Sequence, residues 1–270
     1  YPLGVNGSKN KNNVLYINNA DGIIHGEKKI ISENVAKEDG FRAEPGKPIG
    51  YFLGIASEGI FQNQKQIDEY NAAGYAFMNG YEKAEPGDVI WIDQNGDGKY
   101  DEKDCVEIGN PHPDFTMGFN LSLQWKGFDF SVNGSGAFGQ QVMQSYREFA
   151  LRDTQNYTNN LLARYWTGEG STNKFPRFSA GSHNNFKCNS YNSDIFIQDA
   201  DYIKIRNITL GYDLKSAIKR LPFQSLRFFV TGQNLFTFTK YDGMDPEVGS
   251  GAPGYSWSSG LDTGFYPSPK

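Results

Sequence analysis

A long alternation of apolar and polar side chains constrains the fold of this chain more than any other feature. From Phe115 onward every second residue is apolar, and the residues between are polar or small. The same period of two resumes after Lys126-Gly127. Side chains of a β-strand point alternately to opposite faces, so this period indicates strands with one apolar and one polar face. The sequence predicts a β-hairpin with strands at about 115–126 and 127–138, joined by a tight turn.

The length of these strands distinguishes two settings. Strands of globular proteins usually have about five or six residues, whereas strands that cross a bilayer at a tilt need ~9–11. The hairpin has the longer form. Its ends carry aromatic residues, as in the interfacial girdles of membrane barrels; these are Phe115, Trp125, Phe128 and Phe138. A large soluble β-sandwich remains the alternative on pattern alone.

Two more strands are expected, at about 200–213 and 226–239, each with apolar residues on one face. In the first of them Ile203 and Ile205 are out of phase with the apolar residues that follow. A β-bulge, or a strand that rises above the bilayer, would account for this shift. One helical turn is expected between the two strands, before Pro222.

The connections between the predicted strands alternate between short and long. The long ones are 139–198 and 240–266, and the short ones are 126–127 and 213–225. Outer-membrane barrels combine short periplasmic turns with long extracellular loops in this way. Four strands cannot close a barrel, and lipid does not tolerate open edges. The pattern therefore predicts an all-β chain that forms part of a larger transmembrane β-barrel.

Residues 1–114 are mostly polar and are expected to form an extracellular loop region. Short strand-like pieces occur at residues 14–17 and 51–55. A short helix is expected at 64–73, with Asn63 as its N-cap.

An acidic segment at 93–104 has the spacing of a twelve-residue calcium-binding loop. Oxygen donors fall at the required positions, and Gly98 occupies the sharp turn at the sixth. Because a strand-like run precedes it, the loop is not part of a helix–loop–helix unit. The alternative is an acidic turn closed by hydrogen bonds from side chains to backbone. The predicted structural calcium ligands are Asp93, Asn95, Asp97, Lys99 (through its backbone carbonyl), Asp101 and Asp104.

Composition and motifs argue against several functions. The net charge of −5, without a basic cluster, excludes a nucleic-acid role. No phosphate-binding, dinucleotide-binding or serine-hydrolase motif occurs, so no enzymatic activity is expected. Asp199 and Asp201 would be needed for a glycosidase, but acidic residues beside a strand start are usually solvated. The two cysteines, Cys105 and Cys188, could pair in an oxidising compartment but form no framework.

Short motifs along the chain occur in the order of a known family. They are Gly46-Lys47-Pro48-Ile49-Gly50, Glu58-Gly59-Ile60-Phe61-Gln62, Pro86-Gly87-Asp88, Asp93-Gln94-Asn95-Gly96-Asp97-Gly98, Ile108-Gly109-Asn110-Pro111, Asp201-Tyr202-Ile203-Lys204-Ile205-Arg206, Gly232-Gln233-Asn234-Leu235-Phe236, Asp245-Pro246-Glu247 and Tyr266-Pro267-Ser268-Pro269. This ordered set resembles SusC/RagA-like TonB-linked outer-membrane transporters.

The resemblance implies the C-terminal segment of a barrel of about 22 strands, with the plug domain and the last strand absent from this sequence. It also implies TonB-dependent import of a glycan or oligopeptide, a SusD-like surface lipoprotein as partner, and the outer membrane of a Bacteroidetes-type bacterium. The alternative is a secreted, calcium-stabilised β-sandwich that binds carbohydrate. No ligand-contacting residue is assigned. Loop residues that either line a glycan or peptide site or pack between loops are Tyr146, Arg147, Tyr157, Tyr165, Trp166 and Arg177.

Overall fold

The computed structural model of the chain describes residues 2–26, 39–74, 84–98, 101–144, 164–177, 192–220, 222–243, 245–249, 259–262 and 264. The chain divides into two compact units. The first, here called the long-strand unit, comprises Tyr1–Lys11, His112–Gln141 and Asp199–Glu247. The second, the core unit, comprises Asn12–Pro111, Val142–Gln198 and Val248–Lys270. None of the described helices is long and apolar enough to cross a membrane.

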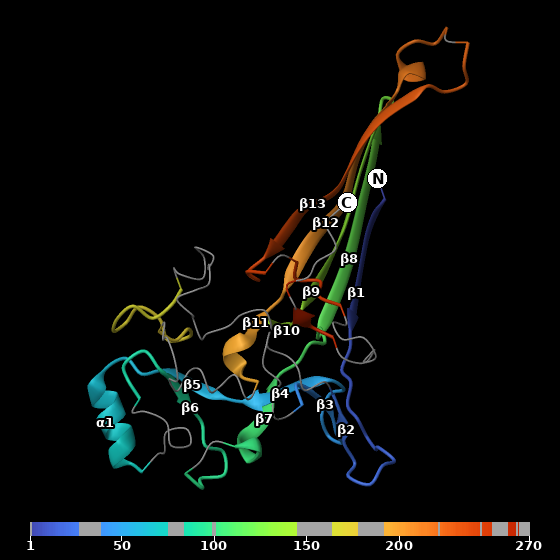
Figure 1. Ribbon diagram of the computed structural model, residues 1–270. Helices are drawn as coiled ribbons and strands as arrows, with labels where there is room; N and C mark the ends of the chain where they lie inside the picture. Colours follow the sequence, from blue (N-terminus) through green and yellow to red (C-terminus); the bar gives the residue numbers. More distant parts are fainter. Residues whose placement is uncertain are drawn as a thin grey trace. The chain divides into compact units, whose positions relative to one another are not determined.

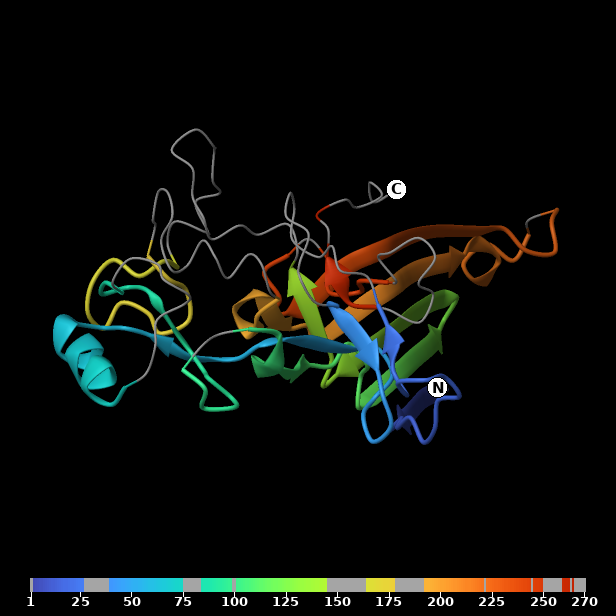
Figure 2. The same cartoon turned by 60° about the horizontal axis from the view of Figure 1, so that its bottom comes forward.

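The long-strand unit is one antiparallel sheet of five strands in the order β1-β8-β9-β12-β13 (Figures 1 and 2). Its strands are β1 (Leu3–Lys9), β8 (Phe115–Trp125), β9 (Phe128–Phe138), β12 (Tyr202–Asp213) and β13 (Arg227–Thr239). The predicted hairpin is β8 and β9, and its turn has Lys126 and Gly127 at positive φ, 48° and 86°. Such backbone angles match the twist of a two-residue hairpin. β1 is a fifth strand that the sequence pattern did not predict.

The two faces of this sheet differ in chemistry. Residues paired across neighbouring strands lie on the same face. One face therefore carries the apolar residues, for example the paired residues Leu121 and Val132, and the paired residues Leu210 and Val230. Many of its large side chains are exposed, above all along β13, where Val230 is 76% exposed. The aromatic residues predicted at the hairpin ends pair with each other, Phe115 with Phe138 and Trp125 with Phe128.

A bulge at Arg206 explains the phase shift in β12. Ile205 pairs with Gly134 of β9, and Asn207 pairs with the very next residue, Asn133. Arg206 is thus an extra residue, and it returns Ile203 and Ile205 to the apolar face. The predicted bulge is confirmed. The predicted helical turn is also present, as η5 (Leu214–Ser216) after β12.

The core unit contains small sheets around a buried apolar cluster. Its strands are β2 (Ile24–His25), β3 (Phe41–Ala43), β4 (Tyr51–Ile55) and β7 (Cys105–Gly109) in one sheet, and β5 (Ser57–Ile60) with β6 (Val89–Trp91) in another. The cluster includes Phe41, Phe52, Ile60 and Trp91. A third sheet has the order β11-β10-β14, with β10 (Gln141–Gln144), β11 (Ile197–Asp199) and β14 (Leu261–Asp262). Short 3-10 turns are η2 (Glu102–Asp104) and η4 (Asp194–Phe196).

Two local predictions for the core unit are confirmed and one is wrong. The helix is α1 (Gln64–Ala72), and the Asn63 side chain accepts the N–H of Gln66 as its N-cap. The strand at 51–55 is β4. The strand predicted at 14–17 does not form. Val14 makes two backbone hydrogen bonds, with Lys47 and Gly46, but Leu15 and Tyr16 after it are 86% and 76% exposed.

Candidate functional site

The acidic loop at 93–104 is closed by hydrogen bonds from backbone to carboxylate. The Asp93 carboxylate accepts the N–H groups of Gly96 and Gly98 at 2.7 and 2.8 Å. Asp104 is buried, and its two oxygens accept the N–H groups of Gln94 and Asp101 at 2.9 and 2.8 Å. These bonds tie the two ends of the loop together.

Several of the predicted calcium ligands also take part in hydrogen bonds within the loop. Asn95 and Asp97 bond to each other through the Asp97 N–H at 2.8 Å, and Asp101 caps η2, while Lys99 lies outside the described residues. In the part of the chain that the structure describes, no three His, Cys, Asp or Glu side chains are grouped to hold a metal. Carboxylate oxygens retain lone pairs after accepting one N–H, and hard oxygen donors suit calcium. Calcium binding stays a prediction.

The described loop residues suggested for ligand contact pack within the core unit. Tyr165 is buried. The Trp166 indole N–H donates to Oε1 of Gln62 at 3.2 Å, and the Gln62 amide donates to the carbonyl of Thr172 at 3.0 Å. These contacts fasten the segment 164–177 beside β5. The other suggested residues, at positions 146, 147 and 157, lie outside the described residues.

Arg177, suggested from the sequence for ligand contact, forms ion pairs with two carboxylates of the core unit. Its Nε lies 2.8 Å from the Asp88 carboxylate, which is buried, and its guanidinium contacts Glu85 at 2.6 Å. A buried carboxylate needs such a partner, because an unpaired charge inside a protein is strongly unfavourable. Arg177 is therefore a structural residue.

Asp199 and Asp201, the carboxylates considered for glycoside hydrolysis, accept hydrogen bonds from nearby residues of the long-strand unit. Asp201 accepts the N–H of Gly139 at 2.7 Å. Asp199 accepts the side-chain amide of Gln141 at 3.3 Å. These bonds secure the approach to β12 and give both carboxylates a structural role.

The polar face of the long-strand sheet carries aligned rows of uncharged hydrogen-bonding groups. Two rows cross four strands in register: Asn120, Asn133, Asn207 and Gln233, then Ser122, Ser131, Thr209 and Thr231. Within the rows, Asn207 donates to Asn133 at 3.2 Å, and the hydroxyls of Thr209 and Thr231 lie 3.0 Å apart. Each carboxamide offers two donors and one acceptor, so part of this capacity remains for a ligand. The amino-acid composition could not predict these rows, because they depend on which residues of neighbouring strands pair with each other.

Comparison with known proteins supplies the family context. No family model matches the chain. It is 28% identical to TonB-dependent receptor P3 of Formosa agariphila over 275 residues, covering 97% of this chain and 25% of that relative. It is 30% identical to TonB-dependent receptor SusC of Bacteroides thetaiotaomicron over 196 residues, covering 72% of this chain and 18% of the relative. The resemblance to SusC/RagA-type TonB-dependent receptors is confirmed.

A solved structure supports the fold. The chain matches a chain of the RagAB peptide importer in its open-open state with a TM-score of 0.61 and 19% identity, over 91% of this chain and 24% of that one. The predicted fold class, a segment of such a β-barrel, is confirmed. So are the outer membrane as location and the prediction that the chain is not an enzyme. The chain spans 25% of the length of receptor P3, so it represents one part of such a receptor's length.

Proposed function

We propose that this chain serves TonB-dependent import of a glycan or oligopeptide nutrient across the outer membrane, as part of the barrel of a SusCD-like complex. A SusD-like surface lipoprotein and TonB are the proposed partners. The observation that carries the proposal is the two-faced sheet, whose apolar face is exposed and whose polar face carries amides and hydroxyls in rows. Lipid would cover the first face and the aqueous lumen would contact the second.

Both substrate classes fit the polar face. Glycans present hydroxyls and peptides present amides, and each pairs with neutral donors and acceptors. The relative RagAB is a peptide importer. The β-sandwich alternative is disfavoured because a sandwich covers its apolar face with a second sheet, whereas side chains such as Phe228 and Val230 are exposed here.

Adjacent residues of β13 provide a matched test. Val230 lies on the apolar face and Thr231 on the polar face. In the full-length receptor, Val230→Arg places a charge in lipid at a cost of about 2–4 kcal/mol near the bilayer midplane, so we expect less folded receptor in outer membranes. Thr231→Arg adds the same side chain toward the lumen and is expected to assemble normally. Folded receptor is measured as the detergent-resistant, heat-modifiable band on gels.

Uptake of labelled oligosaccharide and oligopeptide pools, in cells with and without TonB, tests the activity itself. TonB-dependent accumulation of one pool supports the proposal and names the substrate class. Release of the native protein into detergent-free buffer as a soluble monomer, with equal tolerance of both arginine variants, would overturn it.

A further inference from the structure

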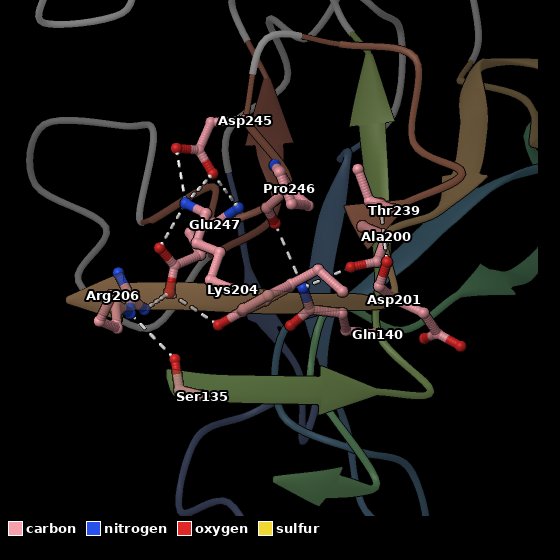
Figure 3. Close-up of polar contacts among 11 residues, drawn as sticks. Ser135, Gln140, Ala200, Asp201, Lys204, Arg206, Thr239, Asp245, Pro246 and Glu247 are labelled. Atoms are coloured by element: carbon pink, nitrogen blue, oxygen red, sulfur yellow. Dashed lines mark hydrogen bonds and ion pairs between the residues drawn. The ribbon is translucent and has the colours of Figure 1, made fainter. Parts of the chain in front are cut away.

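The segment after β13 folds back over the polar face of the same sheet. Residues 240–247, here called the strap, follow Thr239; position 244 lies outside the described residues. The strap begins at a turn in which Thr239 Oγ1 donates to the Asp201 carbonyl at 2.7 Å and accepts the Tyr241 N–H at 3.0 Å. Near its end the Gln140 side-chain amide donates to the Pro246 carbonyl at 3.2 Å (Figure 3).

Two carboxylates of the strap meet two cations of β12. Lys204 Nζ lies 2.7 and 2.8 Å from the two oxygens of Asp245, and 2.7 Å from Oε2 of Glu247. The Arg206 guanidinium pairs with Oε1 of Glu247, and the Tyr202 hydroxyl donates to the same carboxylate at 2.7 Å. Figure 3 shows both carboxylates turned toward Lys204. Lys204, Arg206, Asp245 and Glu247 are here called the strap cluster.

Burial separates this cluster from an ordinary surface ion pair. Lys204 is only 7% exposed, and removing the partner of a buried charge is strongly destabilising. Arg206 also donates to the Ser135 hydroxyl of β9 at 3.0 Å. Lys204 and Arg206 therefore need the carboxylates of the strap to compensate their charges, and the strap is in turn held in place by these two cations. Exposed pairs, by contrast, contribute little.

A hydrogen bond within the strap also holds its two carboxylates in position for Lys204 and Arg206. The Glu247 N–H donates to Asp245 Oδ1 at 2.9 Å, which holds both carboxylates in one turn. Burial alone would raise the pKa of Glu247, but hydrogen bonds from Arg206, Lys204 and Tyr202 outweigh it and lower the pKa to about 2. Both carboxylates face cations, so the charges of the cluster sum to zero.

We propose that the strap cluster locks residues 240–247 closed on the polar face of β12, fixing the start of the connection after β13 and keeping Lys204 and Arg206 away from passing anions. The lock is a property of the long-strand unit and does not depend on the transported substrate. With it closed, this end of the polar face presents no free cation from the cluster. Opening it would expose two cations side by side.

Hydrogen exchange of the full-length receptor, followed by mass spectrometry, tests the lock. Glu247→Gln removes the carboxylate shared by Lys204 and Arg206 while preserving its shape. We expect backbone amides of residues 241–249 to exchange about tenfold faster or more, because the strap opens more often. Strand amides of β8 and β9 are expected to keep their exchange rates.

A matched control uses the second charged pair of the same sheet. Asp129→Asn breaks the pair with Arg227, whose Nε lies 2.8 Å from Asp129, at the far end of β9. This variant is expected to leave the exchange of the strap amides unchanged.

Asp245→Asn removes the second carboxylate of the strap and leaves the strands intact. Combining it with Glu247→Gln should give a non-additive effect on the exchange of the strap amides. Strap amides that exchange without protection in the parent, or equally in parent and both strap variants, would overturn the lock.

Discussion

Replacing Gly54 by alanine tests a close approach of two backbone segments in the core unit. A Cβ on Gly54 would overlap the carbonyl oxygen of Asn192 and would lie 2.6 Å from its carbonyl carbon and from Cδ1 of Ile108. The Ile108 side chain can rotate away. The Asn192 carbonyl cannot do so cheaply, because it accepts the N–H of Ile55 at 2.8 Å.

The expected magnitude follows from these two contacts. Overpacking a rigid site costs about 1–3 kcal/mol, and a lost backbone hydrogen bond adds about 0.5–1.5 kcal/mol. We expect the free energy of local opening at β4 to fall by about 1.5–4.5 kcal/mol, which corresponds to roughly 10- to 2,000-fold faster amide exchange. The assay is hydrogen exchange of the Ile55 amide in the full-length receptor.

The control is Gly249→Ala. No heavy atom lies within 4 Å of an added Cβ there, and its backbone is not in the left-handed region. It should leave exchange unchanged throughout. If the Ile55 amide of Gly54→Ala exchanges at the parental rate, the two segments are not in contact and the reasoning is refuted.

Two further predictions concern the core unit. Asp97→Ala is expected to lower the thermal and proteolytic stability of the acidic loop in the presence of calcium, and equal protection of variant and parent in excess calcium would contradict the metal site. Hydrogen bonds to Asp39, and next to Asp21, raise the pKa of His25. Protonated His25 therefore stabilises the folded state fully below the unfolded pKa of about 6.5. This stabilisation is lost as the pH rises through the raised pKa of the folded state. The exchange protection of the Gly26 amide, which bonds to the Phe41 carbonyl, should fall over that range in the parent, and His25→Gln should remove this dependence; an unchanged pH profile in the variant would speak against it.

The strands that the sequence predicts well are those whose pattern is local. β8 and β9 differ from the predicted hairpin by a residue at the turn, because period two and a Lys-Gly turn are both visible in adjacent residues. The N-cap of α1 was equally visible, because Asn63 acts within one turn of helix. The ordered family motifs identified the larger context.

The features that escaped prediction depend on residues far apart in the chain. β1 contains only Leu3 and Val5 as large apolar residues, and it becomes a strand because β8 offers its edge. Lys204 looks like an ordinary polar residue of a strand until Asp245 and Glu247 return to it. Tyr165 and Trp166 resembled ligand-binding aromatics, and only their contacts with the rest of the core unit show that they pack.

The bulge at Arg206 has a consequence for how insertions and deletions would act on this strand. Residues before it and after it obey the same alternation in two different reading frames, and the extra residue joins these two frames. Deleting Arg206 alone would remove the bulge and leave an unbroken alternation, with Lys204 still on the polar face and Ile205 still on the apolar face. Deleting one residue elsewhere in β12 would instead swap the faces of everything on one side of the deletion, whereas losing two residues there keeps the faces. Length variation in β12 among relatives should therefore occur in steps of two unless the bulge itself is lost or gained.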